Sequence, residues 1–206
     1  MIELSRMLAS RVMRVCDVVI ALTLILILMP LLLAIAIAIK VEDGGPVFFL
    51  QTRIGKDLKS FTVLKFRSMT APPLDQGARQ PDAPPSPREA MSTKVGDRRV
   101  TRVGRVLRPA HFDELPQLFN IVAGQMALVG VRPDTPLQET DYVPEYWKIR
   151  HRYRPGLTGP AQVGPPGQDL PQRTALERIW LENFSFILYL KIILLTILKV
   201  FARNSH

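Results

Sequence analysis

The stretch VVIALTLILILMPLLLAIAIAI at residues 18–39 decides the fold, because its 22 residues carry no charge. A helix of this length is roughly 33 Å long at about 1.5 Å per residue, against a hydrocarbon core of about 30 Å. Every face of that helix is apolar, which disfavours a core helix with one polar side. The run also exceeds the roughly 7–15 residues of a signal-peptide core, which disfavours a cleaved leader. We therefore predict a segment that contacts lipid.

Pro30 stands near the middle of this run, between apolar arms of 12 and 9 residues. Proline removes a backbone donor and clashes with the preceding turn, so the helix should bend there, and each arm alone is too short to cross a bilayer. Arg11 and Arg14 precede the run and Lys40 follows it, so the positive-inside rule gives no orientation. Basic flanks on both sides favour a re-entrant helix-break-helix within residues 1–40. A spanning helix is the alternative, because proline also occurs in spanning helices.

A second apolar stretch covers residues 184–201. Its polar side chains fall within about 80° of one another at about 100° per residue. They are Ser185, Tyr189, Thr196 and Lys199. This pattern predicts a C-terminal amphipathic helix at residues 175–203 that lies in the membrane interface. A second spanning helix is the alternative.

Residues 41–206, which include this C-terminal helix, are predicted to form one compact domain. Residues 46–51 and 61–66 are short runs rich in Val and Phe, separated by a polar turn at 53–57, which predicts a small β-hairpin. Residues 71–88 hold six prolines in 18 positions, which predicts a mobile loop without fixed secondary structure. The expected fold class is α/β and mostly helical.

Composition narrows the class of protein further. The 206 residues fit one ordinary domain, or a small domain with a membrane element, and exclude a multidomain machine. A net charge of +9 favours an anionic partner, such as phosphate, nucleic acid or an anionic lipid surface. Cys16 is the single cysteine, so no intrachain disulfide forms and no oxidising compartment is required.

Asp113 and Glu114 stand within the segment HFDELPQLFN at residues 111–120. Acidic residues at an N-cap and in the first turn, with proline in that turn, predict a helix that begins at Asp113. Such a pair is most often structural. A carboxylate at a helix N-terminus is also held ionised by the dipole and the free N–H groups, so it is available as a nucleophile or as a Mg²⁺ ligand.

Basic side chains recur on both sides of this acidic pair, where several arginines could converge on a di- or triphosphate. They include Lys65, Arg67, Arg108, Arg132, Arg150, Arg152 and Arg154. A solvated or headgroup-facing surface is the alternative, and it is equally compatible with any single arginine. No nucleotide-binding glycine fingerprint accompanies them.

Short motifs spread over nearly the whole chain carry a resemblance to a known family. They are RVCD at 14–17, GPVFF at 45–49, KFRSM at 65–69, RVGRVLR at 102–108, DELPQL at 113–118, LVGVRP at 128–133 and RPGLTG at 154–159. With the proline in the middle of the apolar run, this set closely resembles the bacterial sugar transferases known as monotopic polyprenol-phosphate phosphoglycosyl transferases, in their small form.

The resemblance implies transfer of a phosphosugar from a UDP-sugar to undecaprenyl phosphate in two steps, with Mg²⁺ as cofactor. Asp113 would attack the sugar-linked phosphorus and expel UMP, and the lipid phosphate would then attack the acyl phosphate. Glu114 would assist in positioning the metal or the substrate. Asp113 and Glu114 are the implied metal ligands. The implied phosphate-binding residues are Lys65, Arg67, Arg108, Arg132 and Arg154, and the implied membrane bend is at Pro30.

The family also implies a place in the cell. Residues 41–206 would be a catalytic domain at the cytoplasmic face of the bacterial inner membrane, in contact with its lipid, and would perform the first membrane step of glycoconjugate assembly. A homodimer is left open. A catalytically silent scaffold of a glycan assembly complex is the alternative. A nucleic-acid-binding protein would explain the charge but leaves the apolar run unused and lacks a base-stacking aromatic pattern, so no nucleic acid is expected.

The sequence departs from the family pattern in three places. Met29 replaces the serine before the proline, and His111-Phe112 replaces Ser-Leu before the acidic pair. Residues 160–166 read PAQVGPP where the family has Trp-Ala-Gln-Val-Asn-Gly-Arg, so a substrate-contacting arginine is absent. Arg173 is the nearest candidate to replace it, if the proline-rich turn folds the chain back over the site.

Overall fold

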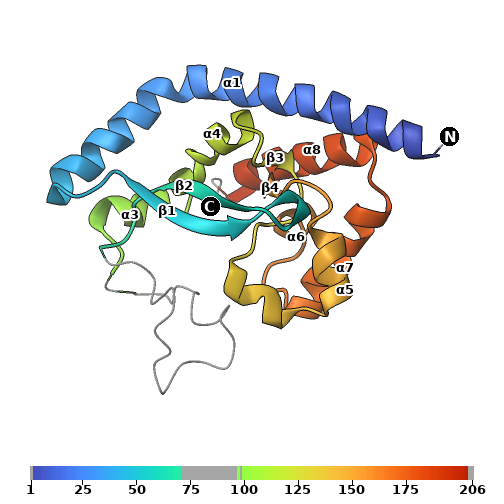
Figure 1. Ribbon diagram of the computed structural model, residues 1–206. Helices are drawn as coiled ribbons and strands as arrows, with labels where there is room; N and C mark the ends of the chain where they lie inside the picture. Colours follow the sequence, from blue (N-terminus) through green and yellow to red (C-terminus); the bar gives the residue numbers. More distant parts are fainter. Residues whose placement is uncertain (1, 71–96, 98, 204–206) are drawn as a thin grey trace.

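The computed structural model describes residues 2–70, 97 and 99–203, and side chains from residue 10 to 200 of these. Within these residues, Figure 1 shows a mostly helical domain beneath one long helix, with two small sheets. The predicted loop at 71–88 lies outside the described residues. The helices are α1 (Ile2–Asp43), α3 (Arg102–Leu107), α4 (Gln117–Val122), α5 (Pro144–Arg150), α6 (Pro160–Val163), α7 (Leu170–Glu182) and α8 (Phe186–Arg203). The strands are β1 (Phe48–Ile54), β2 (Ser60–Phe66), β3 (Ala127–Val129) and β4 (Gly156–Thr158), and the 3-10 turns are η1 (Lys56–Leu58), η2 (Phe112–Glu114) and η3 (Pro136–Asp141).

Helix α1 runs without interruption from Ile2 to Asp43, although it contains Pro30. Figure 1 shows its axis curving over the domain, so that its C-terminal part descends along one side. The predicted helix-break-helix is therefore corrected to one curved helix, which ends three residues beyond the predicted boundary at 40. Proline removes one hydrogen bond of the helical ladder, and packing of both arms on the domain holds the other turns together.

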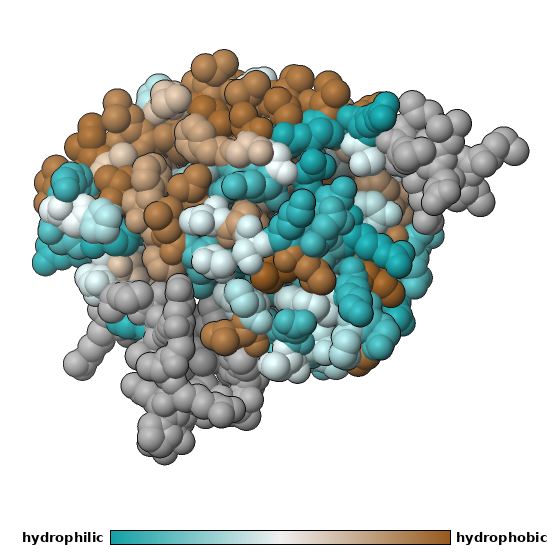
Figure 2. Space-filling view, in the orientation of Figure 1, coloured by the Kyte–Doolittle hydropathy of each residue, from teal (hydrophilic) through white to brown (hydrophobic). Residues whose placement is uncertain are grey.

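One side of α1 packs on the domain along both arms, and the other side is apolar and exposed. Buried residues recur at helical spacing before and after the proline: Met13, Ala21, Ile25, Leu32, Ile35 and Ile39. On the opposite side Leu26 is 73% exposed and Leu33 is 60% exposed. Figure 2 shows the resulting hydrophobic band over α1. In the part of the chain that the structure describes, α1 alone is long and apolar enough to cross a membrane.

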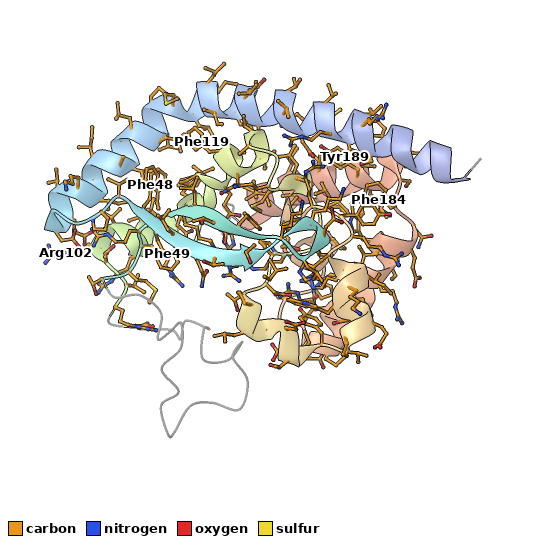
Figure 3. The ribbon with its side chains drawn as sticks, viewed as in Figure 1. Phe48, Phe49, Arg102, Phe119, Phe184 and Tyr189 are labelled. Carbon is orange, nitrogen blue, oxygen red and sulfur yellow. The ribbon has the colours of Figure 1, made fainter. Side chains whose placement is uncertain are left out.

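Polar side chains fix the N-terminal part of α1 to the domain. Asp17 is buried, and its Oδ1 accepts hydrogen bonds from Leu128 N at 3.0 Å and from Tyr189 Oη at 2.9 Å. Figure 3 shows Tyr189 between α8 and α1. Arg14 donates to the last two carbonyls of α4, at 2.7 and 3.1 Å. The RVCD motif therefore joins α1 to α4, β3 and α8.

The C-terminal end of α1 is fixed to the same domain. Glu42 accepts hydrogen bonds from the backbone N–H groups of Arg102 at 2.6 Å and Val103 at 3.2 Å, which satisfies free donors at the start of α3. Asp43 forms an ion pair with Arg67, just after β2. Contacts of Arg14 and Asp17 before the apolar run, and of Glu42 and Asp43 after it, thus all join α1 to one domain.

The predicted interfacial helix at 175–203 is in fact two helices, because α7 and α8 are separated by residues 183–185. Helix α8 is amphipathic, but its polar side binds the domain. Thr196 Oγ1 lies 2.8 Å from Thr158 Oγ1, and Lys199 donates to two carbonyls at the end of α6. Apolar residues of α8, such as Ile187 at 81% exposure, face outward.

The hairpin prediction is confirmed, since β1 and β2 pair in antiparallel register. The strands are longer than predicted, because Arg53 and Ile54 belong to β1 and not to the turn. The parallel pairing of β3 with β4 has no counterpart in the sequence prediction. Glycines permit this close approach, since a Cβ on Gly156 or Gly159 would clash with the backbone of Gly130.

Candidate active site

A cavity of about 990 Å³ lies between the β1–β2 hairpin, η2, the segment after β3 and the start of α7. Asp113 and Glu114 line it. Basic side chains enter the cavity from several elements: Arg53, Lys65, Arg67, Arg99, Arg108, Arg132 and Arg173. The fold therefore gathers carboxylates and cations that are far apart in sequence.

Two cations hold Glu114. Its Oε1 lies 2.7 Å from Lys65 Nζ and 3.3 Å from Arg132 Nη2. Burial favours the neutral acid, but these cations outweigh it and lower the pKa of Glu114 to about 2. Burial also lowers the pKa of Lys65, and the negative charge of Glu114 opposes that shift. Because Lys65 Nζ and Glu114 Oε1 lie only 2.7 Å apart, both groups stay ionised. Strand β2 is itself fixed by Asn120 of α4, which accepts from Leu64 N at 2.9 Å.

Asp113 differs from its neighbour. No hydrogen-bond or ion-pair partner for its carboxylate is found in the described part of the chain. Burial raises the pKa of Asp113, and Lys65 partly opposes that shift. The two adjacent carboxylates are therefore in unlike environments, one anchored by cations and one available to a ligand.

Asp113 and Glu114 lie in the 3-10 turn η2, so the prediction of a helix that begins at Asp113 is wrong. Helix α4 begins at Gln117, after Pro116. Proline has no N–H group to donate to the preceding turn, and the α-helical ladder therefore starts only beyond it. His111 precedes η2 with a left-handed φ of 56°. That conformation is uncommon for residues other than glycine and is frequent at functional sites.

Arg132 lies on the segment after β3, and buried cations hold its backbone. Arg150 Nη2 donates to Arg132 O at 2.7 Å, and Arg53 Nη1 donates to Pro133 O at 3.1 Å. Burial and the charge of Arg132 lower the pKa of Arg53 to about 10. Arg53 was not predicted from the sequence as a site residue, although its alternation with Gln51 on a strand was a usable signal.

The other predicted phosphate-binding residues divide into two groups. Arg67 and Arg108 line the cavity, and Arg67 is paired with Asp43. Arg154 is not in the lining, because its Nε donates to Gly124 O at 2.7 Å and so satisfies a carbonyl after α4. The structure thus does not bring Arg154 to the predicted site.

Arg173 reaches the cavity from α7, as the sequence analysis expected. Its Nε donates to Glu177 Oε1 at 3.0 Å. Asp134 and Gln138 also line this part of the cavity. Neither residue was predicted from the sequence, because no local pattern distinguishes them from loop positions.

The described residues contain no cluster of three or more His, Cys, Asp or Glu side chains that would hold a metal. Mg²⁺ is usually bound by one or two carboxylates with substrate phosphates and water, so it does not need such a cluster. Asp113 and Glu114 supply two adjacent carboxylates on the cavity wall. They fit a Mg²⁺ ion that is shared with a bound phosphate.

The sequence matches a known family over most of its length. A family model described as bacterial sugar transferase matches residues 8–203. The chain belongs to the bacterial sugar transferase family. A UDP-glucose:undecaprenyl-phosphate glucose-1-phosphate transferase of Caulobacter vibrioides is 41% identical to this sugar transferase over 201 residues, which cover 93% of this chain and 70% of that protein.

Two other relatives are covered over a smaller share of their length. An undecaprenyl-phosphate glucose phosphotransferase of Komagataeibacter xylinus is 40% identical over 178 residues, which cover 81% of this chain but 31% of that protein. A UDP-N-acetylgalactosamine-undecaprenyl-phosphate N-acetylgalactosaminephosphotransferase of Aeromonas hydrophila is 37% identical over 164 residues, which cover 77% of this chain and 36% of that protein. This chain therefore matches about a third of the length of these two relatives.

Proposed function

We propose that this sugar transferase moves a phosphosugar from a UDP-sugar to undecaprenyl phosphate and releases UMP. The observation that carries the proposal is the unlike pair of carboxylates, because Glu114 is clamped by Lys65 and Arg132 while Asp113 has no partner for its carboxylate among the described residues. The names of the relatives support both substrates, since they combine undecaprenyl phosphate with UDP-glucose or UDP-N-acetylgalactosamine.

The chemistry has two displacements at one phosphorus atom. In the first, a carboxylate oxygen of Asp113 attacks the sugar-linked phosphorus, the bond to the bridging oxygen breaks, and UMP leaves with the electron pair. In the second, an oxygen of the lipid phosphate attacks the same phosphorus and the bond to Asp113 breaks, which restores the carboxylate. The covalent intermediate lets two bulky anions use one site in turn.

The cations around Asp113 and Glu114 in this cavity make attack by an anion on an anion feasible. Lys65, Arg53 and Arg132 place positive charge at the cavity wall before substrate binds, so little reorganisation is needed when charge moves to the phosphate oxygens. Mg²⁺ bound by Asp113 and Glu114 would add positive charge against the same oxygens.

We place the enzyme at the cytoplasmic face of the bacterial inner membrane, with α1 re-entrant in one leaflet. Asp17 in the N-terminal half of α1 and Glu42 near its C-terminal end both accept hydrogen bonds from backbone N–H groups of one domain, which supports this arrangement. A straight spanning helix would carry one end to the opposite side of the membrane from that domain. The exposed apolar sides of α1 and α8 suit the headgroup and acyl region.

The test is a screen of UDP-sugars for UMP release by purified protein in detergent with Mg²⁺. With the correct donor but no lipid, mass spectrometry should find a phosphosugar on the peptide that contains Asp113. Asp113→Asn should abolish this adduct, whereas Asp57→Asn, in the exposed hairpin turn, should not. Full turnover by Asp113→Asn, or an adduct on another residue, would contradict the proposal. A silent scaffold would release no UMP from any donor.

A further inference from the structure

The cavity has two chemically different ends. Near α3 its lining combines cations with apolar side chains, namely Arg67, Arg99, Arg108, Phe48 and Met69. Near the start of α7 its lining is mostly polar, namely Asp134, Gln138, Gln168, Asp169 and Arg173. Figure 1 shows α3 and α7 on opposite sides of the domain.

The α3 end is the one next to the proposed lipid surface. Helix α3 is bonded to Glu42 at the C-terminal end of α1. Val41 on α1 is 79% exposed and Val106 on α3 is 72% exposed. Figure 1 shows α7 on the far side of the domain from α1. A lipid phosphate that stays at headgroup depth therefore enters at the α3 end.

The proposed reaction restricts which substrate uses each end, and the inference rests on that proposed function. In an in-line displacement the attacking and leaving oxygens lie on opposite sides of the phosphorus. UMP leaves opposite Asp113 in the first step, and the lipid phosphate attacks opposite Asp113 in the second. UMP and the lipid phosphate must then occupy the same end in turn, while the sugar stays in place through both steps.

We propose that the α7 end of the cavity is the sugar subsite, and that Arg173 is a specificity-determining residue that binds the sugar there. The α3 end then receives UMP and afterwards the lipid phosphate. The UMP-binding and lipid-binding positions coincide, and the sugar-binding position is separate.

The side chains at the α7 end have the hydrogen-bonding capacity that a sugar needs. Arg173 Nη2 lies 3.8 Å from Asp134 Oδ1, beyond hydrogen-bonding distance, and has no hydrogen-bond partner within the described residues. Gln168 Oε1 also has none there. Both atoms are buried, but the Arg173 side chain as a whole is 16% exposed, so a sugar hydroxyl can reach the rest of its guanidinium group as a donor.

A buried charge cluster fixes the Arg173 guanidinium. Arg150 is fully buried, and its Nη2 lies 3.0 Å from Asp134 Oδ2 and 3.3 Å from Glu177 Oε1. Asp134 and Glu177 are the two carboxylates beside Arg173. The cluster has two charges of each sign, so Arg173 is held in place before the donor binds, which lowers the entropy cost of sugar recognition.

The test compares the KM for the UDP-sugar with the inhibition constant of UMP in one assay. Arg173→Ala should raise the KM about tenfold or more, because a charge-assisted contact to the sugar is lost. The inhibition constant of UMP should stay unchanged, because UMP binds at the other end. Arg178→Ala is the matched control, since Arg178 is an exposed residue of the same helix, paired with Glu182. Arg99→Ala, at the α3 end, should raise the inhibition constant of UMP.

Three results would overturn the assignment. A parallel rise of the KM and the UMP inhibition constant in Arg173→Ala would mean that Arg173 binds the nucleotide. No change in either constant would mean that Arg173 does not contact the donor. If Arg173→Ala does not fold, Arg173→Lys is measured instead, because lysine keeps the charge without the planar fork. An unchanged ratio of the KM to the UMP inhibition constant in Arg173→Lys would also overturn the assignment. Absence of UMP release by the parent enzyme would instead contradict the proposed function.

Discussion

Lys65 Nζ lies 2.7 Å from Glu114 Oε1, so the second strand of the hairpin is tied directly to the turn that carries Asp113. The two side chains are 16% and 15% exposed, and water screens them only partly. Arg132 contributes a second cation to the same oxygen. Glu114 thus links three separate segments of the chain and sets the position of its neighbour.

Replacement of Lys65 by Ala should lower kcat/KM by roughly ten- to a hundredfold, because Glu114 loses its nearest cation and the cavity loses positive charge. UMP release under single-turnover conditions is the measurement. Lys56→Ala is the control, because Lys56 forms an exposed ion pair in the turn of the same hairpin. An equal effect of the two substitutions would show that the Lys65–Glu114 pair has no particular role.

Glu114 should make folding stability depend on pH in the acid range. Its pKa in the folded protein is about 2, below the unfolded value of about 4.3. A depressed carboxylate pKa stabilises the folded state fully above the unfolded pKa, and the stabilisation falls as the pH drops from about 5 toward 2. The free energy of unfolding of the parent should therefore exceed that of Glu114→Gln at neutral pH, and the difference should shrink on acidification. Urea unfolding in detergent at several pH values measures it, and a constant difference would contradict the assignment.

Elements that are specified by a local pattern of residues could be predicted from the sequence. The Val- and Phe-rich runs at 46–51 and 61–66 around a polar turn predicted the hairpin, and the apolar run at 18–39 predicted an apolar helix, although not its continuity through Pro30. Arg173 was also expected near Asp113, and both residues line the same cavity.

Features that depend on distant contacts were not predictable in the same way. The three-residue strands β3 and β4 carry too little periodicity to detect, and they pair because Gly156 allows close approach to Gly130. The direction of the Arg154 side chain depends on a free carbonyl at Gly124, 30 residues away. The continuity of α1 through its proline depends on packing of both arms, which no local signal in the run reports.

The buried contact between Tyr189 and Asp17 should contribute to stability. Tyr189→Phe removes the hydroxyl that donates to Asp17 Oδ1 at 2.9 Å and should lower the free energy of unfolding by about 1–3 kcal/mol, since the buried carboxylate loses a donor. For a chain of this size the melting temperature should fall by about 2–4 °C per kcal/mol. Tyr153→Phe is the control, because the ring of Tyr153 stacks on Phe184 and the substitution keeps that contact. Equal melting temperatures of the parent and Tyr189→Phe would contradict the prediction.

The membrane topology of α1 can be tested with cysteine labelling. In a Cys16→Ala background, Leu4→Cys and Asp57→Cys stand before and after the apolar run. A membrane-impermeant thiol reagent should label both positions from the cytoplasmic side only, because Asp17 before the apolar run and Glu42 after it both accept hydrogen bonds from one domain. Labelling of the two positions from opposite sides would show a spanning helix.

Pro30→Ala should shift this topology, and it provides the sharper comparison. Alanine restores the missing backbone donor and favours a straight helix, and the 22-residue apolar run is long enough to cross. A fraction of molecules should then label at position 4 from the periplasmic side, at the expense of the contacts that Arg14 and Asp17 make with α4, β3 and α8. Pro46→Ala, outside the run, is the matched control and should leave labelling unchanged. If Pro30→Ala labels like the parent, then packing of both arms on the domain holds α1 re-entrant, and the proline bend is not needed.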